Sequence, residues 1–223
     1  MLLLSDPRVA AVAVAECGER LVDLRSTFRC SDREADGAGL FTRVREGVAR
    51  RLARASASLP TGVELLVVEC WRSPARQAGQ FAAYQRQVRS ARPDLGPAGL
   101  RAAVSAYIAP VEVAPHPTGA AVDLTLCDAT GRELDLGTAV NATPLESSNA
   151  CHTSAFDIPQ RARVNRDLLV EALGGAGLVN YPTEWWHWSF GDRYWAAVTD
   201  ADAAIYGPVT AEEVAAGAPG ASS

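Results

Sequence analysis

Two short segments of the chain hold residue types that could bind a catalytic metal ion. In the first, Asp123 follows His116 by seven positions, and in the second, Glu184 precedes His187 by three. The whole chain has only 3 histidines, and two of them lie in these segments. A catalytic zinc ion takes three protein ligands and keeps a fourth position for water. The sequence therefore predicts one zinc ion per chain, held by His116, Asp123 and His187.

Glu184 indicates what such a site would do. Zinc lowers the pKa of bound water from about 16 to about 7, which makes hydroxide available at neutral pH. A catalytic zinc ion needs only three protein ligands, so Glu184 is free to take a proton from that water and pass it to a leaving amine. The residues thus indicate hydrolysis of an amide bond. The competing hypothesis is a zinc-stabilised binding domain without catalysis, which would need only the three ligands.

The residues around the ligands must bring them together. Gly119 and the two alanines after it would let the backbone turn back tightly, so that His116 and Asp123 face one ion. A strand is predicted from Val122 to Leu126, with Asp123 at its start. The sheet would then hold this ligand on a rigid element.

Further patterns predict the scaffold. Between Leu40 and Leu52 an apolar residue recurs every four positions, which predicts an amphipathic helix. Residues 63–70 are mostly apolar β-formers and predict a central strand that ends at Trp71 and Arg72. Additional helices are predicted after Ser73, from Leu100 to Ile108 and from Arg161 to Leu173, with extended segments in the first thirty residues.

Two parts of the chain lack a regular pattern. Residues 137–160 form a long polar stretch, which in a compact domain is typical of a lid or binding segment. Cys151 and His152 lie there without a further ligand at metal spacing, so we interpret them as loop residues. The composition of residues 207–223 predicts a flexible tail. The fold expected for residues 1–206 is a single α+β domain, with a mostly antiparallel central sheet flanked by helices and zinc in a cleft on the sheet.

Composition narrows the functional classes. The chain has 223 residues, 48% of them hydrophobic and 21% charged, which fits one soluble domain. A net charge of −5 argues against a nucleic-acid partner, and no apolar run reaches the length of a membrane span. Five cysteines without C-x-x-C spacing and no signal peptide favour free thiols in the cytoplasm. Motifs of helical zinc proteases and serine hydrolases are missing too.

The motifs H-x-x-G-x-A-x-D and E-x-W-H resemble those of the D-alanyl-D-alanine dipeptidases, zinc peptidases that include the vancomycin-resistance dipeptidase. The resemblance implies hydrolysis of D-alanyl-D-alanine or a related small D-amino-acid dipeptide in peptidoglycan metabolism. It also implies Glu184 as general base and acid, and Arg72 near the scissile carbonyl. The likeness runs from about Asp6 to Trp195 and includes Asp6-Pro7-Arg8, Trp71-Arg72, Asp123-Leu124-Thr125-Leu126, Leu136-Gly137-Thr138 and Asn165-Arg166.

Three positions that concern substrate binding depart from the family pattern. Ala114 stands where the family commonly has a serine that can hydrogen-bond the substrate carboxylate. Asn141 stands at an aspartate implied in holding the substrate ammonium, and a neutral amide cannot give a charge-assisted bond. Glu69 replaces an aspartate and keeps the charge. A related zinc amidase or carboxypeptidase that acts on a muropeptide or a specialised-metabolite amide therefore stays open as the alternative.

Overall fold

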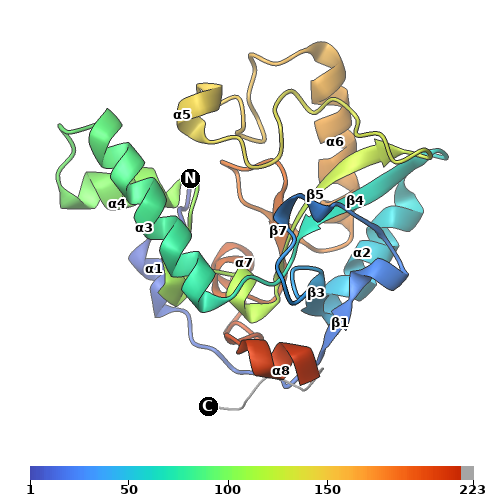
Figure 1. The fold of residues 1–223 in the computed structure, drawn as a ribbon, viewed down its shortest axis with the longest axis horizontal. Coiled ribbons are helices and arrows are strands. Elements are labelled where there is room, and N and C mark those ends of the chain that lie inside the picture. The colour runs from blue at the N-terminus through green and yellow to red at the C-terminus, as the bar shows by residue number, and fades with distance from the viewer. Residues whose placement is uncertain (217–223) are drawn as a thin grey trace.

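The fold is built around a five-stranded sheet with the strand order β2-β4-β5-β7-β6. A computed structural model describes residues 1–216 of the chain (Figure 1). Strand β2 runs parallel to β4, whereas the pairs β4–β5, β5–β7 and β6–β7 are antiparallel. This confirms the predicted α+β class with a mostly antiparallel sheet. The strands are β2 (Arg29–Cys30), β4 (Val63–Glu69), β5 (Ala121–Asp128), β6 (Val179–Asn180) and β7 (His187–Ser189), and a separate two-stranded sheet joins β1 (Leu21–Asp23) to β3 (Arg43–Arg45).

Helices lie on both sides of this sheet. Two of them begin with sequence signals that fix their first turn: the Ser73 hydroxyl accepts a hydrogen bond from the Arg76 main chain, and Pro74 and Pro97 open α3 and α4. The helices are α1 (Pro7–Ala11), α2 (Glu46–Ser58), α3 (Pro74–Ala91), α4 (Pro97–Ser105), α5 (Pro144–Ser147), α6 (Gln160–Gly175), α7 (Arg193–Thr199) and α8 (Ala211–Ala216). Short 3-10 turns span Leu24–Ser26, Asp32–Glu34, Val111–Val113 and His116–Thr118.

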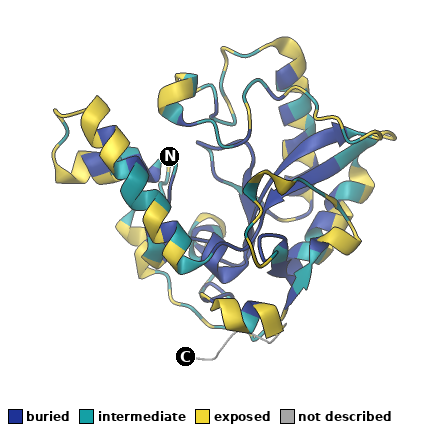
Figure 2. Cartoon of the chain, viewed as in Figure 1, coloured by how far each residue is buried: buried dark blue, intermediate teal, exposed yellow. Residues whose placement is uncertain are grey.

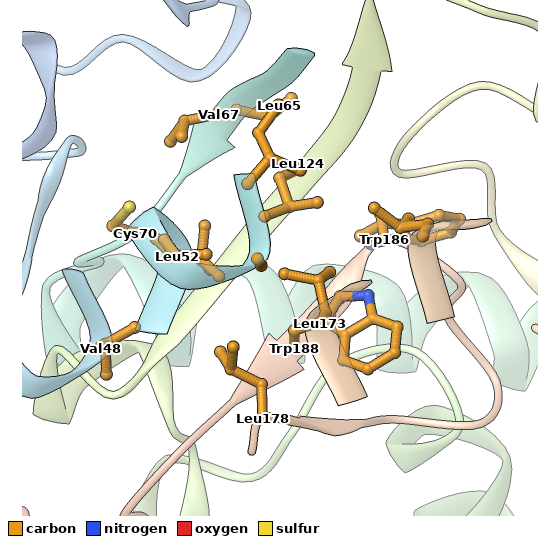
Figure 3. Packing of buried hydrophobic residues seen from close by; sticks show 14 of the residues in the cluster. Val48, Leu52, Leu65, Val67, Cys70, Leu124, Leu173, Leu178, Trp186 and Trp188 are labelled. Carbon is orange, nitrogen blue, oxygen red and sulfur yellow. The ribbon is translucent and has the colours of Figure 1, made fainter. Parts of the chain in front are cut away.

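One face of the sheet carries the main hydrophobic core. Helices α2 and α6 pack against each other, and their apolar residues join those of β4 and β5 (Figure 3). The long strands β4 and β5 are buried along most of their length, whereas the outer surface of α3 and α4 is exposed (Figure 2). In β5 the core residues Val122, Leu124 and Leu126 alternate with residues of the opposite face, so Asp123 points away from this core.

A β-bulge puts a second charged residue on the face of Asp123. Val67 pairs with Leu124, but Glu69 rather than Val68 pairs with Asp123, because the register shifts between Val67 and Glu69. The extra residue reverses the alternation of side chains beyond the bulge. Glu69 is therefore turned to the same face as Asp123, although a regular strand would have pointed it into the apolar core.

The structure differs from the sequence prediction at residues 40–45. The predicted helix starts only at Glu46, and Arg43–Arg45 pair with β1 instead. Arg45 accounts for this difference because its buried guanidinium donates to the main-chain oxygens of Thr118 and Gly207. Val44 is buried as a strand residue, so its four-residue spacing from Val48 does not mark a turn of the helix.

Both ends of the described chain also differ from expectation. Residues Pro7–Ala11, predicted as extended, form α1, which begins at an Asp6 cap that accepts from the Arg8 main chain. The expected tail begins with residues that pack on the domain: Val209 and Val214 are buried, and the Val209 main chain donates to the Pro117 carbonyl. Residues 217–223 lie outside the described part.

Other expectations concern cysteines and membrane spans. All five cysteines are free thiols, and burial raises the pKa of the Cys30 thiol to about 11. Among residues 1–216, no helix is both long enough and apolar enough to cross a membrane.

Candidate metal centre and active site

The side chains of His116, Asp123 and His187 converge at one point. Their donor atoms all lie within 4.8 Å of one another, and all three residues are buried. Asp123 Oδ1 lies 2.9 Å from His187 Nδ1, and Asp123 Oδ2 lies 3.3 Å from His116 Nε2. Two imidazole nitrogens and a carboxylate around one point form a donor set that could hold a divalent metal ion.

Different elements deliver these three residues. Asp123 and His187 are directly opposite each other in the antiparallel pair β5–β7, so the sheet itself brings them together. His116 comes from the 3-10 turn before β5, which ends at Gly119 with φ of +70°. A Cβ at Gly119 would lie 2.7 Å from Leu21 Cδ2, so both the turn and its close packing require glycine.

The surroundings of His116, His187 and Asp123 bear on how each could bind a metal ion. His116 Nδ1 lies 2.5 Å from the Cys70 carbonyl oxygen, which can only accept, so this contact places the donor at Nδ1 and leaves Nε2, on the side of Asp123, for a metal ion. Burial lowers the pKa of His187 and keeps that imidazole neutral. Burial opposes ionisation of Asp123, but the adjoining His116 and His187 hold its pKa well below the usual range.

Glu184 lies beside this cluster without being one of its three donors. Its Oε2 is 3.8 Å from His187 Nδ1, and the residue is buried on the turn that leads into β7. The Asn180 side chain donates to the Glu184 carbonyl and fixes the main chain there. Burial and the negative charge of Asp123 raise the pKa of Glu184, which Arg72 partly opposes. A bound cation would offset the Asp123 charge and favour the carboxylate form.

Arg72 is held rigidly at the edge of the cluster. Its guanidinium is bidentate with Glu69, with Nε 3.1 Å from Oε1, and Nη1 donates to Gln77 Oε1 at 3.0 Å. The same group lies 3.8 Å from Asp123 Oδ2. Burial works against the charge of Arg72, but Glu69 raises its pKa above the ordinary value, so it stays protonated. Arg72 is thus a fixed cation next to the candidate metal position.

These groups line a cavity of about 320 Å³. Asn141 lies on its wall, whereas Glu69 reaches it only through Arg72. Ala114 is buried in an apolar cluster with Leu4 and Tyr181, and its neighbour Pro115 lines the cavity instead. The lining also contains residues that no motif indicated, among them Leu4, Glu34, Gln77, Gln80, Tyr84, Gln87, Tyr107, Ile108 and Glu146.

Arg166 fixes the long polar segment that closes one side of this cavity. Its buried guanidinium donates to the main-chain oxygens of Leu136, Ala150 and His152 at 2.7, 2.8 and 2.6 Å. The segment between these residues includes α5 and contributes three residues to the lining. The predicted binding segment is therefore tied to α6 by Arg166, and Arg163 adds bonds to the carbonyls of Ala155 and Phe156. His152 in this segment lies outside the metal cluster.

Known proteins resemble this chain over its central part. The peptidase M15 family, described as D-Ala-D-Ala dipeptidase, matches residues 40–203, which is more than half of the chain. A D-alanyl-D-alanine dipeptidase of Synechocystis sp. is 34% identical over 94 residues, 39% of this chain and 38% of that protein. One from Escherichia coli is 42% identical over 72 residues, 32% of this chain and 35% of the relative. The aligned part thus spans well under two thirds of either relative's length. The family match over 164 consecutive positions, which include all three metal-binding candidates, shows that the chain belongs to the M15 peptidase family of D-Ala-D-Ala dipeptidases.

Proposed function

We propose that the protein is a zinc-dependent dipeptidase that hydrolyses D-alanyl-D-alanine or a related D-amino-acid dipeptide. One observation carries the proposal: Glu184 and Arg72 lie on the wall of the same cavity as His116, Asp123 and His187. A purely structural metal site has no use for a buried spare carboxylate and a buried guanidinium at its edge. The names of the two relatives support D-alanyl-D-alanine as the first substrate to test.

In this proposal His116, Asp123 and His187 hold the ion, because imidazole nitrogens and a carboxylate oxygen are donors that fit zinc. When bound, zinc supplies the Lewis acidity that makes water nucleophilic at neutral pH. Glu184 accepts a proton from the attacking water and transfers it to the nitrogen of the leaving amine. The water oxygen bonds to the carbonyl carbon, the C–N bond breaks, and the products are two amino acids.

Arg72 has a different role. The carbonyl oxygen gains negative charge when water adds, and a fixed cation at the cavity wall stabilises that charge. Glu69 and Gln77 hold the guanidinium in place, so no reorganisation is needed during the reaction. Glu69 is therefore a positioning residue, reaching the substrate region through Arg72.

The size of the cavity supports a small substrate. Ligand pockets span about 300–1,000 Å³, and this cavity of about 320 Å³ lies at the low end. The lid segment held by Arg166 closes one side of the space. Five unpaired thiols support a reducing compartment such as the cytoplasm for the reaction.

The test is a substrate panel with the purified protein. D,D-, L,D- and L,L-alanyl-alanine and their N-acetyl forms are incubated with it, and the released alanine is quantified. We expect turnover of the free D,D-dipeptide, loss of activity after chelation, and recovery on addition of zinc. Turnover of only the N-acetyl forms would instead support the amidase or carboxypeptidase alternative, and turnover of none would contradict the proposal.

A further inference from the structure

A row of alternating charges connects the candidate metal ligands with Glu34. Asp123 contacts Arg72 at 3.8 Å, and Arg72 is bidentate with Glu69. Glu69 Oε1 lies 3.5 Å from Arg76 Nη1, and Arg76 Nη2 lies 2.7 Å from Glu34 Oε2. Arg76 is thus shared between Glu69 and Glu34, so neither carboxylate has this guanidinium to itself. Glu34 is its outer end and lies on the cavity wall.

Asn141 completes the end of this row. Its side-chain amide donates to Glu34 Oε1 at 2.8 Å, so the carboxylate is held from both sides, by Asn141 and by Arg76. The Asn141 backbone is itself fixed, with φ of +66° and its carbonyl accepting from the Tyr107 hydroxyl at 3.0 Å. Asn141 is neutral, so the negative charge here comes from Glu34.

The Glu34 carboxylate still has room for another partner. An ionised carboxylate offers about four lone-pair sites, and the hydrogen bonds from Asn141 and Arg76 use two of them. Its side chain is 22% exposed, and both Glu34 and Asn141 line the cavity. The pair therefore presents fixed acceptors with a net charge to whatever enters the cavity.

We propose that Glu34, oriented by Asn141, binds the free amino group of the substrate. An ammonium carries three donors, and charge-assisted bonds to a carboxylate are about twice as strong as neutral ones. An N-acylated substrate offers no such cation. The proposal rests on the dipeptidase function and makes Glu34 the residue that selects substrates with a free amino terminus.

The test separates binding from hydrolysis. Binding of D-alaninamide and of N-acetyl-D-alaninamide to the zinc-loaded protein is measured by NMR titration, which covers millimolar affinities. Glu34→Gln should weaken D-alaninamide binding about 10- to 100-fold and leave the N-acetyl probe unchanged. Glu112→Gln serves as control, since Glu112 is an exposed carboxylate that also pairs with an arginine.

A second variant, in which the carboxylate and the amide change places, tests whether Glu34→Gln acts only by disturbing the local structure. In Glu34→Gln with Asn141→Asp the amide and the carboxylate exchange places and can keep their mutual hydrogen bond. This double variant should recover much of the preference for D-alaninamide over its N-acetyl form. Equal losses for both probes in Glu34→Gln, no loss for either, or a wild type without preference would each overturn the role of Glu34. These outcomes do not depend on hydrolysis, so they are distinct from a failure of the dipeptidase function in the substrate panel.

Discussion

The Nδ1 atom of His116 lies 2.5 Å from the main-chain carbonyl oxygen of Cys70. Cys70 directly follows β4, and Arg72 comes two residues later, so one strand end orients a candidate metal ligand and also carries the candidate oxyanion-stabilising group. We therefore expect metal binding and the position of Arg72 to be coupled through this strand end.

The three candidate ligands give the first prediction. His116→Ala, Asp123→Ala and His187→Ala should each lower zinc content by at least tenfold, because two remaining donors do not complete a tetrahedral site. The measurement is elemental analysis of protein purified without added metal, where the wild type should hold about one equivalent. His152→Ala is the control, since His152 lies outside the cluster. Full zinc retention in all three ligand variants would contradict the assignment.

Arg72 gives the second prediction, which concerns both turnover and stability. Arg72→Ala should reduce kcat about 10²- to 10³-fold through loss of oxyanion stabilisation. It also leaves the buried Glu69 without its bidentate partner, which costs about 3–5 kcal/mol. For a domain of this size that corresponds to a fall in Tm of about 6–20 °C.

An exposed pair provides the matched control for Arg72. Arg29→Ala breaks a salt bridge of 2.6 Å to Glu64, but both side chains are more than 40% exposed, so the loss of stability should be small. Thermal unfolding of both variants makes the comparison. A similar Tm for Arg29→Ala and Arg72→Ala would show that the buried pair contributes no more to stability than the exposed pair.

Gly119 gives the third prediction. Gly119→Ala forces a side chain into the left-handed region and into contact with Leu21, so it should destabilise the fold and lower zinc affinity by shifting His116. Gly62 has φ of +86° and open space around it, so Gly62→Ala isolates the backbone cost of about 1–2 kcal/mol. Chemical denaturation should show a clearly larger loss at Gly119. Equal losses would mean that the contact with Leu21 relaxes freely.

The sequence was sufficient to predict the three candidate ligands, because their residue types and spacing stand out in two short motifs. A strand at residues 63–70 and helices after Ser73 and Arg161 were also predictable, since their apolar patterns are local and Ser73 supplies a cap for the first of these helices. The strand of Asp123 begins at Ala121, one residue earlier than predicted, and the sequence did not show that Asp123 pairs with His187. Local sequence patterns thus predicted the candidate ligands but not the register in which their strands pair.

Non-local contacts account for what the sequence did not predict. Glu34 reaches the cavity from the 3-10 turn Asp32–Glu34, more than a hundred residues away from Asn141, and no spacing rule connects them. The bulge that turns Glu69 toward Arg72 depends on pairing between β4 and β5. Arg45 likewise lies in a strand, where its side chain donates to the main-chain carbonyls of Thr118 and Gly207, which are distant in the sequence. Such contacts appear only when the chain is folded.

Glu184→Gln tests the central claim most directly. The amide keeps the shape of the side chain but cannot accept and return a proton, so turnover of D-alanyl-D-alanine should fall about 10⁴-fold. Since Glu184 is not one of the three donors, zinc content and Tm should match those of the wild type. The measurement is alanine release by wild type and variant at equal zinc occupancy. A variant with full zinc and full turnover would contradict the proposed mechanism, and a variant that loses its zinc would make Glu184 a ligand.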